Sequence, residues 1–388
     1  MAGVVAVPTR AALRRVRAQA RGVSRSVMFL LVPVSLLVVI GLGAILSASS
    51  VLGLRETGDG LYYFKRQIVW LVIGVFGMVT AAFIPLRWWR RMAFPLFTMT
   101  IGLLGAVMVF GTRANGATRW LIVGPISIQP SEIAKLTTVL FLAAVVSRRE
   151  YEMIRLRDFF FPVAGSVGLV AILVMAQPDL GTTLLISAGA FAVLLASAVP
   201  LRFVVGSAVA STGGAFLLAV SSPYRWARVT AFLDLQSDPL GSSYQAVQGL
   251  VALGTGGLWG VGLGASRARW SFLPNAHTDF VFAILGEETG LAGSLAVVAL
   301  FTSLTIAGTL IAQRSTDRFG RLVAVGITTW LAVQAVVNIG GVVGVLPITG
   351  VPLPFVSFGG TALVVSLVGV GVLVSVARDV DLIEAYHR

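Results

Sequence analysis

Long apolar stretches, separated by short polar segments, recur along the chain from residue 27 onward. Each stretch has 17 to 30 residues, and at about 1.5 Å per helical residue this is close to or above the length that crosses a bilayer core. The stretches are 27–48, 67–84, 92–110, 131–147, 159–176, 180–199, 203–221, 283–312, 322–345 and 357–377. The pattern predicts an all-α integral membrane protein with about ten transmembrane helices.

The polar segments between these stretches define the predicted domain organisation. Residues 1–26 are basic and contain no acid, residues 27–378 form the ten-helix membrane domain, and residues 379–388 form a short tail. The first apolar stretch is too long for the apolar part of a signal peptide and is interpreted as a spanning helix. The longest polar segment, residues 222–279, is predicted to be a large loop between helices 7 and 8.

Composition supports a membrane protein and excludes several kinds of chemistry. Hydrophobic residues make up 57% of the chain and charged residues only 12%, which is far from a soluble enzyme. The absence of cysteine excludes disulfides and thiolate catalysis. The two histidines, His277 and His387, fit no metal-binding spacing, so no protein metal site is predicted. No nucleic-acid partner is expected.

The distribution of basic residues predicts the orientation in the membrane. With the N-terminus inside, 19 of the 29 Lys and Arg residues fall in inner segments and nine in outer segments. Inner segments of membrane proteins carry the excess of positive charge, so both termini are predicted to be cytoplasmic. This orientation places the 222–279 loop, and Asp279 at its end, at the outer face.

The stretch Trp270–Gly290 contains the strongest candidate for chemistry. Asp279 lies where the polar loop enters an apolar segment, and ionisable groups at membrane depth are expensive unless they have a function. The alternative is that Asp279 caps the helix that follows it, where a carboxylate meets free backbone N–H groups. Local sequence alone leaves both interpretations open.

The loop before Asp279 has its own pattern. Apolar residues at helical spacing predict a short amphipathic or re-entrant helix: Tyr244, Val247, Leu250 and Val251. The glycine-rich run Gly254–Gly264 either cradles a phosphate or forms a turn that allows close backbone packing. Arg267 and Arg269 then suggest an anionic partner, although a solvated interfacial pair is the ordinary interpretation.

Three other polar clusters interrupt the apolar pattern. Glu132 and Lys135 stand at i and i+3 in a predicted helix, where they either neutralise each other or take part in catalysis. Asp179 has the position of a helix cap. The stretch Gly344–Leu363 has three prolines and four glycines and should break the helix and line a cavity.

Taken together, these motifs resemble the SEDS family of bacterial cell-wall polymerases. The similarity covers nearly all of residues 27–378, and within the family it favours the FtsW type, which acts at the division septum. The motifs occur in the family's order: NGATRWL with QPSEIAK, then QPDLGT, then LPNAHTDFVFAILGEETGLAG, then GVPLPFVSFGGTAL. Phe358 and Thr361 replace the tyrosine and serine that are usual in the last motif.

The resemblance implies polymerisation of lipid II into β-1,4-linked glycan with release of undecaprenyl pyrophosphate. Asp279 matches the family's essential aspartate and is the expected base. The residues expected to bind substrate or support the site are Arg119, Glu132, Lys135, Arg267, Arg269, His277, Thr278, Glu287 and Ser357. Of the predicted pyrophosphate ligands, Arg119 and Lys135 lie in family motifs, while Arg267 and Arg269 are chosen by charge. On an ideal helix from Asp279, the side chain of Glu287 would lie about 80° away and support it.

The resemblance also predicts cofactors, partners and location. A divalent cation, Mg²⁺ or Mn²⁺, is expected at most as an aid to the leaving pyrophosphate. The expected partners are lipid II, a class B penicillin-binding protein that acts as transpeptidase, and other division proteins. The location would be the bacterial cytoplasmic membrane at the septum. An elongation polymerase of the RodA type, a lipid II flippase and a non-catalytic division scaffold are the alternatives.

Overall fold

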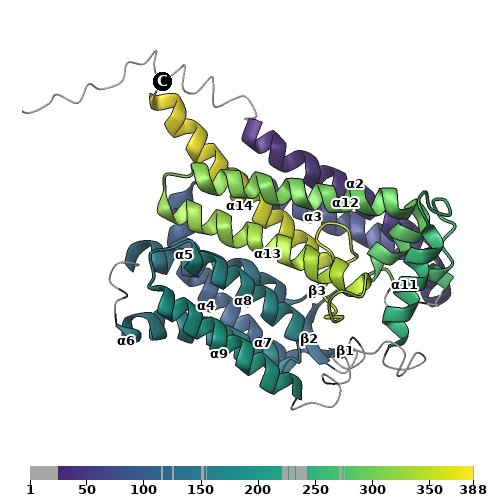
Figure 1. Ribbon diagram of the computed structural model, residues 1–388, viewed down its shortest axis with the longest axis horizontal. Helices are drawn as coiled ribbons and strands as arrows, with labels where there is room; N and C mark the ends of the chain where they lie inside the picture. Colours follow the sequence, from purple (N-terminus) through teal and green to yellow (C-terminus); the bar gives the residue numbers. More distant parts are fainter. Residues whose placement is uncertain are drawn as a thin grey trace, which may run out of the picture.

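The computed structural model describes residues 25–387, apart from 115–116, 125, 150–152, 154, 221–225, 227–231, 233–242, 271–272 and 275 (Figure 1). Most of the basic segment 1–26 and much of the loop 222–279 therefore lie outside the described residues. The division into domains stays a prediction.

Apolar helices lie side by side along the long axis of the molecule (Figure 1). They are α2 (Arg25–Thr57), α3 (Tyr62–Phe83), α4 (Leu86–Phe110), α5 (Pro130–Arg149), α6 (Leu156–Phe159) continued by the π-helical turn η1 (Phe160–Ala164) and α7 (Gly165–Ala176), α8 (Leu180–Leu195), α9 (Leu201–Val220), α12 (Val281–Arg314), α13 (Arg318–Val342) and α14 (Gly360–His387).

These helices make the chain a multi-pass membrane protein. Eight helical spans of the described residues are long and apolar enough to cross a membrane, and α8 is a shorter apolar helix. Each follows one of the apolar stretches of the sequence, and α9, with 20 residues, follows another. The helical membrane fold is confirmed, while the count of ten spans stays a prediction.

The core lies along α5, α13 and α14, which are mostly buried, whereas α3 and the α6–α7 segment are mostly exposed at the periphery. Small residues allow the close contacts, because apolar side chains gain little from leaving lipid and helices pack through van der Waals contact. At Gly41, a Cβ atom would lie only 2.6 Å from the backbone oxygen of Phe355. This glycine lets α2 press directly on the irregular segment before α14.

A small antiparallel sheet interrupts the helical pattern between α4 and α5. Its strands are β1 (Thr112–Ala114), β2 (Ala117–Val123) and β3 (Ile126–Ile128), in the order β1-β2-β3. The all-α prediction missed it, although Asn115-Gly116 between two short runs is a strong hairpin signal in sequence. Strand β2 carries Arg119, and β3 leads through Gln129 into α5.

Helix α12 is broken at Gly290, whose φ of 69° and ψ of −163° are not helical. Backbone groups of residues 287–292 pair instead with residues 257–262, at N···O distances of 2.9 to 3.2 Å. Backbone freed in a membrane must find partners within the protein, and this loop supplies them. The glycine-rich run therefore serves close backbone packing: a Cβ atom at Gly260 would lie 2.1 Å from the Glu288 oxygen.

The predicted loop helix is present as α11 (Tyr244–Gly256), but its buried face differs from the expected one. The buried residues are small: Ala246, Gly249, Ala252 and Gly256. The larger apolar residues of the predicted stripe are partly or largely exposed. Small residues face the protein because α11 packs closely on α12.

Candidate active site

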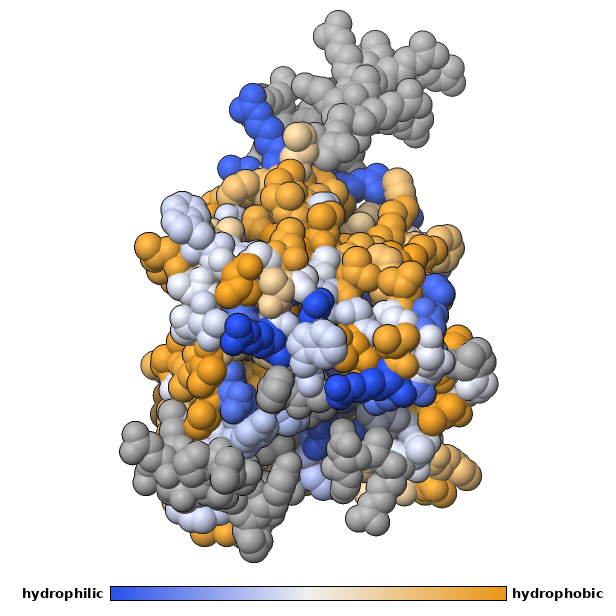
Figure 2. Space-filling model, turned by 90° about the vertical axis from the view of Figure 1, so that its right-hand side faces the viewer, coloured by the Kyte–Doolittle hydropathy of each residue, from blue (hydrophilic) through white to orange (hydrophobic). Residues whose placement is uncertain are grey.

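A cavity of about 400 Å³ opens at the end of the bundle that carries α11 and the sheet. Residues from α3, the sheet, the starts of α5 and α8, the turn before α12 and the segment 350–362 line it. Figure 2 views the molecule from this side, where hydrophilic residues gather in the middle between hydrophobic surfaces. The charged side chains of the lining are Arg66, Arg119, Glu132, Asp179 and Asp279.

Asp279 lies on the turn 276–280 at this cavity and is partly buried. Helix α12 begins at Val281 with Phe280 in the cap position, so Asp279 stands one residue before the cap. The backbone oxygen of Asp279 accepts a hydrogen bond from the Asn338 side-chain nitrogen at 2.8 Å, and this nitrogen also donates to the Val351 oxygen at 2.8 Å. The N-cap position of α12 is therefore held by Phe280 and not by Asp279.

Asp179 lines the same cavity, but its carboxylate has a structural role. It caps α8 by accepting from the Thr182 backbone N–H at 3.2 Å. It also accepts from the hydroxyl groups of Thr182 and Ser131 and from the Gln129 amide, at 2.9, 3.3 and 3.3 Å. The structure thus has the predicted cap, and it adds Asp179 to the cavity wall.

Glu132 and Lys135 form the ion pair that their i, i+3 spacing predicts. The Lys135 Nζ lies 2.7 Å from the Glu132 Oε2, and both side chains are buried. The contact between Lys135 Nζ and Glu132 Oε2 does not have the geometry of a hydrogen bond, so it is an ion pair only. Lys135 donates to the Gln334 Oε1 at 2.9 Å and lies 5.2 Å from the centre of the Trp330 ring. Glu132 reaches the cavity, whereas Lys135 lies behind it.

Two arginines give the cavity its positive charge. Arg119 on β2 holds the turn before α8, since its guanidinium donates to the Gln177 oxygen at 3.0 Å and to the Pro178 oxygen. Arg66 on α3 donates to the Tyr62 hydroxyl at 3.1 Å. The sequence prediction did not single out Arg66. Arg66 is a basic residue at an outer boundary, which runs against the positive-inside tendency and could have drawn attention to it. It precedes Trp70, another lining residue of the cavity, by one helical turn.

His277 and Thr278 line the cavity beside Asp279, as predicted. The His277 ring lies between Tyr63 and Phe358, with ring centroids at 4.9 and 5.7 Å. Burial in this aromatic surrounding lowers the pKa of His277, so the imidazole is neutral at pH 7. His277 therefore adds no positive charge to the cavity.

Glu287, predicted to support Asp279, lies elsewhere. Its carboxylate accepts from the Ser266 hydroxyl and from the backbone N–H groups of Arg267 and Ala268, the last two at 3.0 and 3.3 Å. It thus anchors the loop after α11 and is not among the described lining residues of the cavity. The ideal-helix estimate was wrong because the helix starts after Asp279, at Val281.

Arg267, Arg269 and Ser357 are likewise outside the described lining. The Arg269 guanidinium lies 5.8 Å from the centre of the Trp270 ring, on the loop that Glu287 anchors. The Ser357 hydroxyl accepts from the Leu353 N–H at 2.9 Å and closes a turn. The structure therefore gives no support to their prediction as ligands at the Asp279 cavity.

The carboxylates of the cavity do not form a metal cage of their own. Across the described ranges, no group of three or more His, Asp or Glu side chains could hold a metal ion. Asp179 is surrounded by hydrogen-bond donors and Glu132 is paired with Lys135. A divalent cation here would need oxygen ligands from a substrate as well.

The apolar helices define the class, a multi-pass membrane protein, and a polar cavity lies at one end of its helical bundle. The family is narrower. The chain belongs to the cell cycle proteins of the FtsW, RodA and SpoVE family, whose model matches residues 27–381.

Relatives and solved structures agree with this membership. The chain is 39% identical to the probable peptidoglycan glycosyltransferase FtsW of Mycobacterium tuberculosis, over 89% of this chain and 66% of the relative. It thus spans about two thirds of the length of that relative. Stage V sporulation protein E of Bacillus subtilis is 39% identical, over 90% of this chain and 96% of the relative.

A solved structure described as "Structural coordination of polymerization and crosslinking by a peptidoglycan synthase complex" contains a similar chain. The TM-score is 0.73 at 30% identity, over 90% of this chain and 97% of the other. The fold is therefore shared along nearly the whole length of both chains.

Proposed function

We propose that this protein is a peptidoglycan glycosyltransferase that polymerises lipid II for septal cell-wall synthesis. The observation that carries the proposal is Asp279 beside Arg66 and Arg119 in one cavity at the membrane boundary. Lipid II unites a membrane-bound lipid, an anionic pyrophosphate and polar sugars. A cavity with these charges at the end of an apolar bundle fits such a substrate.

Asp279 acts as the general base. It takes the proton from the C4 hydroxyl of the acceptor GlcNAc, and that oxygen attacks C1 of MurNAc on the donor. The C1–oxygen bond to the pyrophosphate breaks, so undecaprenyl pyrophosphate leaves with the bonding electrons. Attack from the face opposite the α-linked leaving group gives the β-1,4 bond.

Arg66 and Arg119 stabilise the charge that develops on the leaving pyrophosphate. Both guanidinium groups reach the cavity while part of each is fixed by the protein, Arg66 by Tyr62 and Arg119 by the turn before α8. Fixed donors need less reorganisation during the reaction than free ones. Lys135 acts indirectly: it lies behind the cavity wall and neutralises Glu132, which lines the cavity.

A divalent cation at the pyrophosphate is part of the proposal, with Glu132 or Asp279 as protein ligands and the substrate as the main source of oxygen. Mg²⁺ is held in this way, by one or two carboxylates and substrate phosphates. The bound cation would supply positive charge to the leaving group. A class B penicillin-binding protein is the proposed partner, by analogy with the polymerisation and crosslinking complex that contains a similar chain.

The proposed topology has both termini in the cytoplasm and the Asp279 cavity outside. Arg148 and Arg149 support it, because they end α5 about 30 Å from its start beside the cavity. Single cysteines in this cysteine-free chain test it. Ala265→Cys, exposed near Arg267, should react with an impermeant thiol reagent in intact spheroplasts, and Thr316→Cys, exposed between α12 and α13, should not. The opposite labelling would place the cavity inside and end the proposal.

The activity itself is tested with purified protein and lipid II in detergent. The proposal predicts glycan polymers on a gel, increased by the cognate transpeptidase partner and decreased by a chelator if a cation assists. A flippase cannot be scored without a bilayer, and a scaffold makes no glycan. Absence of polymer from folded protein, with the partner and Mg²⁺ present, would contradict the proposal.

A further inference from the structure

A second cavity, of about 620 Å³, lies at the other end of the bundle from Asp279. It lies between the end of α5 and the start of α6 and η1. Helix α5 begins beside the Asp279 cavity and has 20 residues, so the two cavities are about 30 Å apart along the bundle. The second cavity is therefore separate from the proposed glycosyltransferase site.

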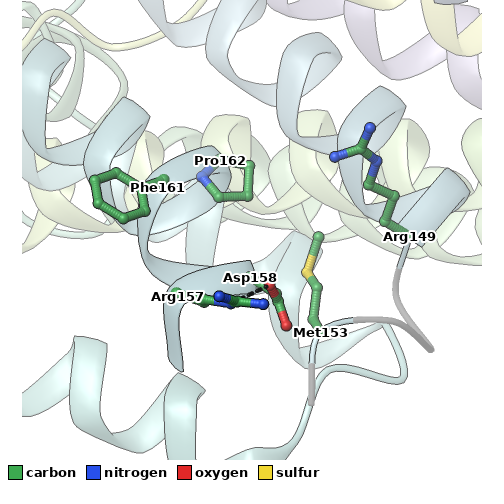
Figure 3. Close-up of a pocket in the computed structure, with 6 residues that line it drawn as sticks. All are labelled: Arg149, Met153, Arg157, Asp158, Phe161 and Pro162. Atoms are coloured by element: carbon green, nitrogen blue, oxygen red, sulfur yellow. Dashed lines mark ion pairs between the residues drawn. The ribbon is translucent and has the colours of Figure 1, made fainter. Parts of the chain in front are cut away.

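Figure 3 shows the side chains of this cavity. The Arg157–Asp158 ion pair lies between two apolar residues on one side and an arginine and a methionine on the other. The residues are Arg149, Met153, Arg157, Asp158, Phe161 and Pro162. Two arginines and one aspartate give the described part of the lining an excess of one positive charge.

Within the described residues, this positive charge is only partly neutralised. Among the described residues, Arg149 makes no hydrogen bond or ion pair. Arg157 approaches Asp158 only through Nε, at 3.5 Å, and the two side chains are 70% and 38% exposed. Such an exposed pair is weak. Guanidinium groups match the geometry of a phosphate group, which they bind with two parallel hydrogen bonds.

Apolar side chains flank the arginines on the membrane side. Leu156, Phe160 and Phe161 are 63%, 51% and 75% exposed, although they begin a span that is apolar enough to cross a membrane. Exposed aromatic and aliphatic side chains at the start of such a span are suited to contact with lipid tails. A soluble phosphate compound would use the arginines but leave these residues without a partner.

We propose that this cavity binds an anionic phospholipid. Its headgroup phosphate lies between Arg149 and Arg157, and its acyl chains leave the cavity past Phe161 along the exposed side chains of Leu156 and Phe160, which lie outside the lining. Basic pockets at the ends of membrane helices bind lipid headgroups in this way. The proposal does not rest on the glycosyltransferase reaction; on the proposed topology, the lipid belongs to the inner leaflet.

Native mass spectrometry of the full chain, purified in detergent and titrated with phosphatidylglycerol, tests the proposal. The variant Arg149→Gln with Arg157→Gln should bind roughly 30-fold more weakly, from about fivefold for each arginine near a membrane surface. The matched control is Arg148→Gln with Arg155→Gln, which removes the same charge from exposed residues of the same segment outside the described lining. This control should bind like the unmodified protein, and phosphatidylcholine should bind weakly to all of them.

A second variant, Asp158→Asn, should change lipid binding in the opposite direction. It removes a negative charge from the cavity and releases Arg157, so phosphatidylglycerol should bind more tightly. A residue with only a structural role would not increase binding when changed. Size-exclusion profiles and melting temperatures establish that each variant is folded.

Three results would overturn the proposal. Equal loss of binding in both double variants would indicate general attraction to a basic surface. Unchanged binding in the Arg149 and Arg157 variant would show that the lipid does not use this cavity. Equal binding of phosphatidylcholine and phosphatidylglycerol to the unmodified protein would show that headgroup charge does not matter.

Discussion

Two turns at the Asp279 cavity each place an aspartate just before an apolar helix, yet the two carboxylates differ. Asp179 is only 4% exposed, occupies the cap position of α8 and accepts hydrogen bonds from four donor groups. Asp279 is more exposed, and Phe280 occupies the cap position of α12. A shift of one residue relative to the helix start separates the carboxylate that caps α8 from the one that we propose as the general base.

Contacts with the surrounding structure hold each of the two turns in place. Asn338 on α13 holds the backbone oxygen of Asp279 and that of Val351, so the turn and the irregular segment before α14 are joined. Gln129 and Ser131, at the start of α5, direct their polar groups to Asp179 instead. The difference between the two aspartates therefore comes from residues that are distant in sequence.

A third carboxylate, that of Glu132, sharpens the comparison because its charge is balanced by one buried lysine. Lys135→Met should lower the free energy of unfolding by about 3 to 5 kcal/mol, since it leaves Glu132 charged and unpaired in the bundle. Thermal unfolding in detergent measures this loss. The variant Glu132→Gln with Lys135→Met should regain most of the stability; failure to regain it would show that Lys135 has another structural role.

The same substitution at the two aspartates should affect stability differently. Asp179→Asn places an NH₂ group among the donors from Gln129, Ser131 and Thr182, and should cost about 1 to 3 kcal/mol of unfolding free energy. Asp279→Asn keeps the shape and an acceptor oxygen, and should melt close to the unmodified protein. Equal melting temperatures for the two variants would contradict the structural role of Asp179.

The smallest predicted effect concerns pH. Burial lowers the pKa of His277 below its value in the unfolded chain, so the unfolded state binds more protons in acid. The contribution of neutral His277 to the free energy of unfolding is fully present above about pH 6.5. It is lost as the pH falls, first through the pKa of His277 in the unfolded chain and then through its lower pKa in the folded protein. Melting temperatures between pH 7.5 and 5.5 should fall less in His277→Gln than in the unmodified protein. Parallel curves would contradict this contribution.

Sequence predicted those features that depend on residues close along the chain. Apolar length gave the helices, the i, i+3 spacing gave the Glu132–Lys135 pair, and the residue type before an apolar run gave the Asp179 cap. The same signal suggested a cap at Asp279, and only the position of the first helical residue decides between them. The resemblance of the motifs, and not local physics, had favoured Asp279 as the base.

Two misses at the site also depended on which distant segments pack together. Glu287 was expected beside Asp279 on an ideal helix, but it faces the loop after α11, and the break at Gly290 makes room for that loop. Arg66 reaches the cavity from α3, and no local motif links it to the other residues of the site. Tertiary packing in a membrane is set by small residues and backbone contacts, which leave a weak signal in a single sequence.

Lipid II polymerisation by purified Asp279→Asn and Asp179→Asn, assayed together at equal amounts of folded protein, tests the central claim most directly. The Asp279 variant should lose about 10²- to 10⁴-fold in rate, because an amide cannot take the proton from the acceptor hydroxyl. The Asp179 variant should retain most of its activity for each folded molecule. Substantial polymer from folded Asp279→Asn protein would contradict the assignment of Asp279 as the base.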